Sequence, residues 1–126
     1  MIVFEFKCVA NIQQYQRIDE AIRITQFIRN KCLRYWMDNS KKTAYDLNRY
    51  TAVLAREFSF ANNLNSMARQ AASERCWFAI NRFFANCKAK KPGKKGYPKF
   101  QKRCRSVEYK TTGLKLTAGQ EIHHLY

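Results

Sequence analysis

Side chains that could perform acid–base or metal chemistry are few and scattered along this chain. The nine carboxylates are Glu5, Asp19, Glu20, Asp38, Asp46, Glu57, Glu74, Glu108 and Glu121. Metal-dependent cleavage of a phosphodiester needs several carboxylates that converge on the ions. Only Asp19 and Glu20 are adjacent, and neighbouring positions on a helix point in different directions. The sequence also lacks the Walker, GxSxG and HExxH motifs, so it predicts no catalytic residues.

Cysteine and histidine positions do not predict a metal site either. The five cysteines are odd in number and widely spaced, at Cys8, Cys32, Cys76, Cys87 and Cys104. A zinc site that used the His123–His124 pair is conceivable, but the closely paired ligands that define most structural zinc sites are missing. We therefore interpret the cysteines as small buried hydrophobic residues or bystanders, and we predict no metal and no cofactor.

The strongest chemical signal is a basic segment that contains aromatic residues. The chain carries 24 basic and nine acidic residues, for a net charge of +15. Residues 88–110 hold ten of the basic residues and one acid, together with Tyr97, Phe100 and Tyr109. Lys and Arg neutralise phosphates, and aromatic rings can stack on unpaired bases. The alternative is an ordinary charged surface loop. A membrane surface is less favoured, because the segment is not an amphipathic helix with a broad apolar face.

The sequence therefore predicts DNA and RNA as partners, with no small-molecule substrate. The residues predicted to contact nucleic acid are Lys88, Lys90, Lys91, Lys94, Lys95, Tyr97, Lys99, Phe100, Lys102, Arg103, Arg105, Lys110, Arg29 and Arg34. The arginines of the first predicted helix, Arg17 and Arg23 included, form either a flank that contacts phosphates or simply a solvated face.

Three helices are predicted to position this segment. Apolar residues recur every three or four positions from Asn11, the expected N-cap, to about Asp38. Similar periodicity predicts helices over residues 44–57 and 62–88. In the last helix, small residues should allow close packing, and most of the aromatic residues are expected in the helical core; these are Trp77, Phe78, Phe83 and Phe84.

Strands are predicted near both ends of the chain. Residues 1–10 alternate in polarity around Phe4 and Phe6, as a strand does. A turn at Pro92–Gly93 should end the long helix, and strands are predicted at 107–110 and 114–117. No apolar run is long enough to span a bilayer and no signal peptide is recognisable, so the protein is expected to be cytoplasmic.

Two stretches of the chain resemble the TnpB, or OrfB, proteins of bacterial insertion sequences. The first runs from Phe4-Glu5-Phe6-Lys7 through Gln14–Ile22 to Phe27–Trp36. The second, more specific, is Ala79–Phe84 followed by a basic loop and Gly96-Tyr97-Pro98-Lys99-Phe100-Gln101-Lys102, which is similar to an "FF … G-x-P-x-F-K" signature. Gln101 stands where a Lys is more usual. The resemblance extends to about Thr117.

This resemblance implies both a fold and a function. Full-length members are RNA-guided DNA endonucleases, whose first segment grips guide RNA and DNA. The fold class expected is α+β, mainly α: a helical recognition lobe of about three helices, with a few strands of an incomplete wedge-like β-barrel from the two chain ends. Residues 1–117 would form this wedge and helical recognition region, with a helix-turn-helix conventionally assigned to residues 1–40. Residues 118–126 would form a divergent tail.

The carboxylates of the family's RuvC-like nuclease domain have no counterpart in this sequence, which we expect to be truncated before that domain. The expected function is therefore a nucleic-acid-binding fragment, associated with transposition, rather than an enzyme. Two alternatives stay open: an active transposase or nuclease in its own right, and a DNA-binding regulator with a helix-turn-helix.

Overall fold

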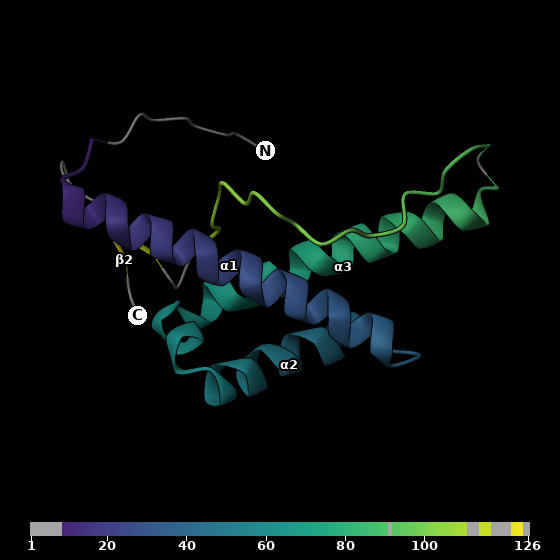
Figure 1. Ribbon diagram of the computed structural model, residues 1–126, viewed down its shortest axis with the longest axis horizontal. Coiled ribbons are helices and arrows are strands. Elements are labelled where there is room, and N and C mark those ends of the chain that lie inside the picture. The colour runs from purple at the N-terminus through teal and green to yellow at the C-terminus, as the bar shows by residue number, and fades with distance from the viewer. Residues whose placement is uncertain (1–8, 91, 111–113, 117–121, 125–126) are drawn as a thin grey trace.

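Three α-helices and one 3₁₀ helix form the main body of the protein (Figure 1). The computed structural model describes residues 9–90, 92–110, 114–116 and 122–124. The strand predicted for residues 1–10 lies almost wholly outside these ranges, and Lys91 lies outside them too.

Helix α1 spans Ile12–Asp38, as the periodicity and the predicted N-cap indicated. The Asn11 side chain accepts a hydrogen bond from the backbone N–H of Gln14 at 2.9 Å, and the Gln14 side chain accepts one from the N–H of Asn11 at 3.0 Å. This reciprocal capping box satisfies backbone donors that a helix otherwise leaves without partners. The start of α1 is therefore determined by residues that lie three positions apart.

Helix α2 spans Ala44–Glu57, also as predicted, and begins with a capping box between Thr43 and Asp46. The third helix begins later than the sequence indicated. A 3₁₀ helix, η1, occupies Ser59–Asn63, and α3 then spans Ser66–Lys88 with Asn65 as its N-cap. The Asn65 side chain accepts from the N–H of Met67 at 2.8 Å.

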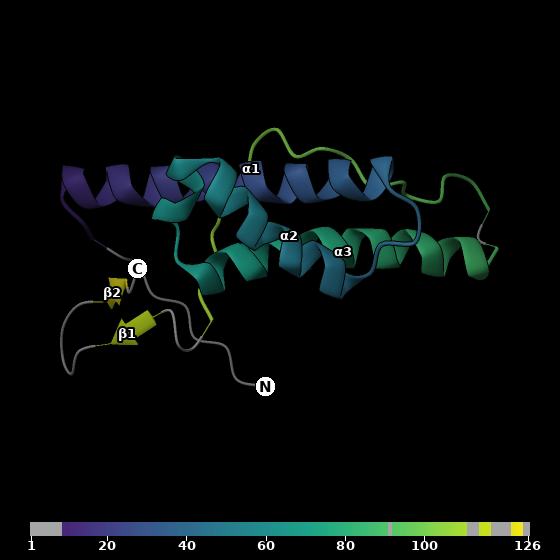
Figure 2. The same cartoon turned by 90° about the horizontal axis from the view of Figure 1, so that it is seen from below.

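The three helices alternate in direction along the chain (Figures 1 and 2). Helices α1 and α3 run in the same direction, and α2, which follows α1 in the sequence, runs in the opposite one. Helix α3 contacts both of the others. Its first half carries Ala68, Ala71 and Ala72, each at most 1% exposed, which lets the neighbouring helices approach closely as predicted. Figure 1 also shows the start of α1 projecting beyond the other helices, and Ile12 there is 75% exposed.

The core lies between the helices and consists of small and aliphatic side chains. Burying one side chain such as Ile28 or Leu54 contributes roughly 1.5–3 kcal/mol relative to exposure. The core residues are Ala21, Ile24, Ile28, Cys32, Leu33, Leu47, Leu54, Ala61, Leu64, Ala68, Ala71, Ala72, Cys76 and Ile80.

The expected α+β fold with part of a wedge-like barrel is wrong. The body is all-helical, and the strands among the described residues are two of three residues each, β1 at Leu114–Leu116 and β2 at Ile122–His124. They pair antiparallel with each other, Lys115 opposite His123. The predicted strand at 107–110 has no strand structure. Val107 and Tyr109 instead pack against the helical core, which accounts for their alternating hydrophobicity.

Candidate nucleic-acid interface

The basic segment returns along the helices after α3 ends. We call residues 94–110 the strap; it contains neither helix nor strand. Lys90, Gly93 and Gly96 have positive φ values of 53°, 81° and 75°, which reverse the chain direction. Gly93 belongs to the predicted Pro-Gly turn, and a side chain there would be strained by its left-handed backbone. The strap then runs back alongside α1 and α3 (Figures 1 and 2).

Asn30 makes the central contact between α1 and the strap. Its side-chain Nδ2 donates to the Gln101 carbonyl at 2.8 Å, and its Oδ1 accepts from the Gln101 N–H at 2.8 Å. A single amide side chain thus replaces the pair of backbone hydrogen bonds that a neighbouring strand would supply. The contact joins residues 71 positions apart in the sequence. It involves only the backbone of Gln101, so any residue other than proline at this position can make it.

Other helix side chains hold the strap backbone on either side of this contact. On α1, Arg29 donates to the Lys99 carbonyl at 2.9 Å, and Gln26 accepts from the Cys104 N–H at 2.8 Å. On α3, Asn86 donates to the Lys95 carbonyl and Arg75 to the Ser106 carbonyl, both at 3.0 Å. The strap backbone is therefore fixed by polar side chains from two helices, and it runs antiparallel to α3, whose Asn86 holds Lys95 and whose Arg75 holds Ser106.

Three of the predicted contact residues already have partners within the protein. Arg29 holds the strap, as described above. Lys110 forms an ion pair with Glu74, with the two side chains 35% and 44% exposed. Arg34 pairs with Asp38 at 3.1 Å one helical turn away. Ion pairs this exposed contribute about 0–1 kcal/mol, so their main effect is to neutralise charge locally.

The other Lys and Arg residues predicted to contact nucleic acid, among those that the structure describes, are largely exposed to solvent. Within the strap, Lys95 is half-buried, whereas the others are exposed: Lys94, Lys99, Lys102, Arg103 and Arg105. Lys88 and Lys90, which precede the strap, are exposed too. Helix side chains bind the strap through its backbone, and this leaves five of its seven basic side chains exposed and available to an external anion.

Both predicted aromatic contact residues retain substantial exposure. Tyr97 is 51% exposed and Phe100 is 43% exposed, on either side of buried Pro98. The Tyr97 ring lies edge-to-face with Phe83, with ring centroids 5.1 Å apart. Contrary to the expectation for the last helix, two of its aromatic residues also reach the surface: Phe84 is 47% exposed and Phe78 is 61% exposed.

Arg29 was predicted as a nucleic-acid contact rather than as an anchor, and Gln26, Asn30 and Asn86 were absent from the sequence prediction. Gln26 and Asn30 lie four positions apart, on one face of α1 beside the apolar residues. Two side-chain amides at that spacing, next to the buried face of a helix, could have indicated that another segment of the chain packs there, because the backbone N–H and C=O groups of such a segment need hydrogen-bond partners. Asn86 on α3 has a similar role, but its isolated position gives no such signal.

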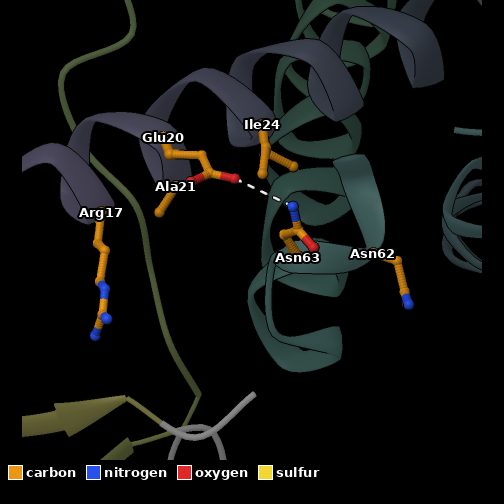
Figure 3. Close-up of a pocket in the computed structure, with 6 residues that line it drawn as sticks. All are labelled: Arg17, Glu20, Ala21, Ile24, Asn62 and Asn63. Carbon is orange, nitrogen blue, oxygen red and sulfur yellow. Dashed lines mark hydrogen bonds between the residues drawn. The ribbon is translucent and has the colours of Figure 1, made fainter. Parts of the chain in front are cut away.

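Arg17 and Arg23, in the first half of α1, interact with the helical body rather than with the strap backbone. Arg17 lines a surface hollow of about 320 Å³ between α1 and η1, together with Glu20, Ala21, Ile24, Asn62 and Asn63. Asn63 Nδ2 donates to Glu20 Oε1 at 3.2 Å across this hollow, and Figure 3 shows Arg17 and Asn62 on opposite sides of that bond. The Nε of Arg23 donates to the Asp19 carbonyl at 3.4 Å.

Two of the cysteines fit the prediction of small buried hydrophobic residues. Cys32 and Cys76 are fully buried, and burial raises the pKa of both thiols, that of Cys76 to about 11. Cys104 is partly exposed, and Cys87 is exposed. Among the described residues, no three His, Cys, Asp or Glu side chains form a group that could hold a metal ion.

Comparison with known proteins gives no relative. No protein-family model, curated protein or solved structure matches this chain significantly. Of the helices that the structure describes, none is both long enough and apolar enough to cross a bilayer.

Proposed function

We propose that this chain binds nucleic acid through the strap, as the nucleic-acid-binding portion of a TnpB-like protein associated with transposition. The observation that supports the proposal best is the arrangement of the strap. Its backbone is held by side chains of α1 and α3, while five of its Lys and Arg side chains are exposed. The only acid between residues 88 and 110 is Glu108.

A fixed row of cations suits a polyanion for two reasons. Each Lys or Arg that neutralises a phosphate releases condensed counterions, which favours binding without regard to base sequence. A backbone that is already held in place also loses less conformational entropy when the ligand binds. The net charge of +15 adds long-range attraction for a polyanion, although it opposes compact folding by self-repulsion.

The resemblance to TnpB proteins suggests RNA and DNA together as the ligands. It rests on the same part of the chain, since the Gly96–Lys102 motif forms the first half of the strap. A function of this kind would place the protein in the bacterial cytoplasm. It is a binding function, with the strap contacting phosphates and no side chain assigned to catalysis.

The proposal is tested by comparing two triple variants that lose equal charge. The strap variant combines Lys99→Gln, Lys102→Gln and Arg103→Gln. The control removes three exposed cations in and next to α2, by combining Lys41→Gln, Arg49→Gln and Arg56→Gln. Affinity for a fluorescent RNA and a DNA of equal length is measured by anisotropy over a series of salt concentrations.

The strap variant should bind more weakly than the control, and its salt dependence should be shallower. Each lost phosphate contact lowers the slope of log affinity against log salt by about 0.7–0.9, so three contacts correspond to a change of roughly 2–3. Equal loss in both variants would mean that net charge alone drives binding, and would refute a role for the strap. Absence of salt-sensitive binding by the unmodified protein would refute the function itself.

A further inference from the structure

Four aromatic side chains meet at the end of the molecule where the strap begins. We call Trp36, Phe83, Phe84 and Tyr97 the aromatic cluster; its members come from α1, α3 and the strap. The Trp36 ring lies 5.8 Å from that of Phe84 and 5.9 Å from that of Tyr97, between centroids. Phe83 contacts both Phe84, at 5.7 Å, and Tyr97, at 5.1 Å. Such contacts in tilted and edge-to-face geometry restrict the orientation of each ring.

Half of the surface of two of these rings is nevertheless open to solvent. Phe84 is 47% exposed and Tyr97 is 51% exposed, while Trp36 and Phe83 are partly covered beneath them. Single exposed apolar residues are common on protein surfaces. Phe84 and Tyr97 instead come from different elements and share the same two ring neighbours, Trp36 and Phe83. Exposed apolar side chains that gather in this way are typical of a binding site.

The charges around the cluster determine what can bind there. Lys95 and Lys99 flank Tyr97 in the strap, and Arg82 and Lys88 flank the two phenylalanines on α3. The nearest acid in sequence, Asp38, is two residues beyond Trp36 and is ion-paired with Arg34. A ligand that covers the rings must therefore combine flat apolar faces with negative charge.

We infer that the aromatic cluster stacks on unpaired bases, so that the strap binds single-stranded nucleic acid in preference to duplex. This inference rests on the proposed function and specifies its ligand. In a single strand each base presents an accessible π face next to a phosphate, whereas in a duplex those faces are stacked on each other. Bases stack on Phe84 and Tyr97, and the phosphates that follow meet the exposed cations of the strap.

The test compares the variant Phe84→Leu/Tyr97→Leu with a matched control. Leucine keeps apolar bulk and removes the ring. The control Phe78→Leu/Tyr45→Leu makes the same changes at two other exposed aromatics, 61% and 68% exposed, which line a separate hollow between α2 and α3. Circular dichroism and thermal melting establish that both variants fold.

Three ligands of equal length separate stacking from charge: an oligothymidylate, a fully abasic strand with the same phosphates, and a duplex. Stacking contributes about 1–3 kcal/mol per base, which corresponds to roughly a 5- to 150-fold change in affinity. The cluster variant should lose that factor for oligothymidylate and retain its affinity for the abasic strand and the duplex. The control should bind all three like the unmodified protein.

A second readout monitors the cluster directly. In a Trp77→Phe background, Trp36 is the remaining tryptophan. Its emission should be quenched by oligothymidylate and not by the abasic strand, since only the former places a base against the rings that contact it.

The outcomes are distinguishable. If the unmodified protein binds none of the three ligands in a salt-sensitive way, the proposed function itself fails. If it binds them but the cluster variant keeps its affinity for oligothymidylate, or loses affinity for all three equally, nucleic-acid binding stands and stacking is refuted. Binding to phosphatidylserine-containing vesicles is measured as well. If the cluster variant loses vesicle binding but keeps its affinity for oligothymidylate, the cluster belongs to a membrane-binding surface, and the inference is refuted.

Discussion

Replacing Asn30 with alanine should release the strap from α1 without unfolding the helices. The substitution removes the two hydrogen bonds of 2.8 Å to the Gln101 backbone. An intramolecular hydrogen bond contributes about 1 kcal/mol net, so docking of the strap at this point should weaken by roughly 2 kcal/mol. That corresponds to a factor of about 30 in the equilibrium between docked and undocked strap.

Native-state hydrogen exchange is the appropriate assay, because opening of the strap is local. Protection of the Cys104 amide, whose acceptor Gln26 is left in place, should fall by up to about 30-fold in Asn30→Ala, while amides in the core of α3 keep theirs. Global melting is a weaker readout, since alanine favours a helix over asparagine by up to about 0.7 kcal/mol and offsets part of the loss.

Asn81→Ala serves as the control, because Asn81 is exposed on α3 and its substitution brings the same gain in helix propensity. Gln26→Ala should lower protection of the Cys104 amide, whose N–H donates to the Gln26 side chain. Unchanged exchange at Cys104 in the Asn30→Ala protein would show that the Asn30 contact does not hold the strap in solution, and would refute the reasoning.

Three further predictions concern the helical body. The Oγ1 of Thr25 is buried without a hydrogen-bond partner, so Thr25→Val should raise the free energy of unfolding by about 1 kcal/mol in urea denaturation; a lower free energy would contradict this. Hydrogen bonds from Thr43, the backbone N–H first and the hydroxyl second, lower the pKa of Asp46. The stabilisation is therefore present above the usual carboxyl pKa and lost as the pH falls through the folded value, so the melting temperature of Asp46→Ala should lie below that of the unmodified protein at neutral pH and converge with it in acid. Burial raises the pKa of Cys76 to about 11, so in single-cysteine variants a thiol reagent should modify exposed Cys87 at once and Cys76 only at the rate of unfolding.

The helices could be predicted because their signals are local. Capping boxes that begin at Asn11 and Thr43 place a helix start within four residues of sequence. The predicted start of α3 was less accurate. Asn62, Asn63 and Asn65 are all suitable N-cap residues, and the local sequence does not select Asn65 among them.

The strap could not be predicted because its contacts join distant residues. Alternation at Val107 and Tyr109 indicated a strand, but a segment laid over a helical core alternates in the same way. The basic residues themselves were visible in the sequence. Which of them are exposed, and which are engaged as Arg29 and Lys110 are, depends on how the strap docks.

The way in which the strap is anchored places different evolutionary constraints on the strap side chains and on the helix side chains that hold it. Each anchor joins a helix side chain to a backbone atom of the strap, so it persists with any strap side chain other than proline. If the strap binds nucleic acid as proposed, mutations at Lys99, Gln101 or Ser106 can therefore change what it recognises while leaving its attachment intact. Under the proposed function, ligand preference can then drift rapidly among descendants of this gene, whereas Gln26 and Asn30, whose side chains hold the strap backbone, should be the slower to change.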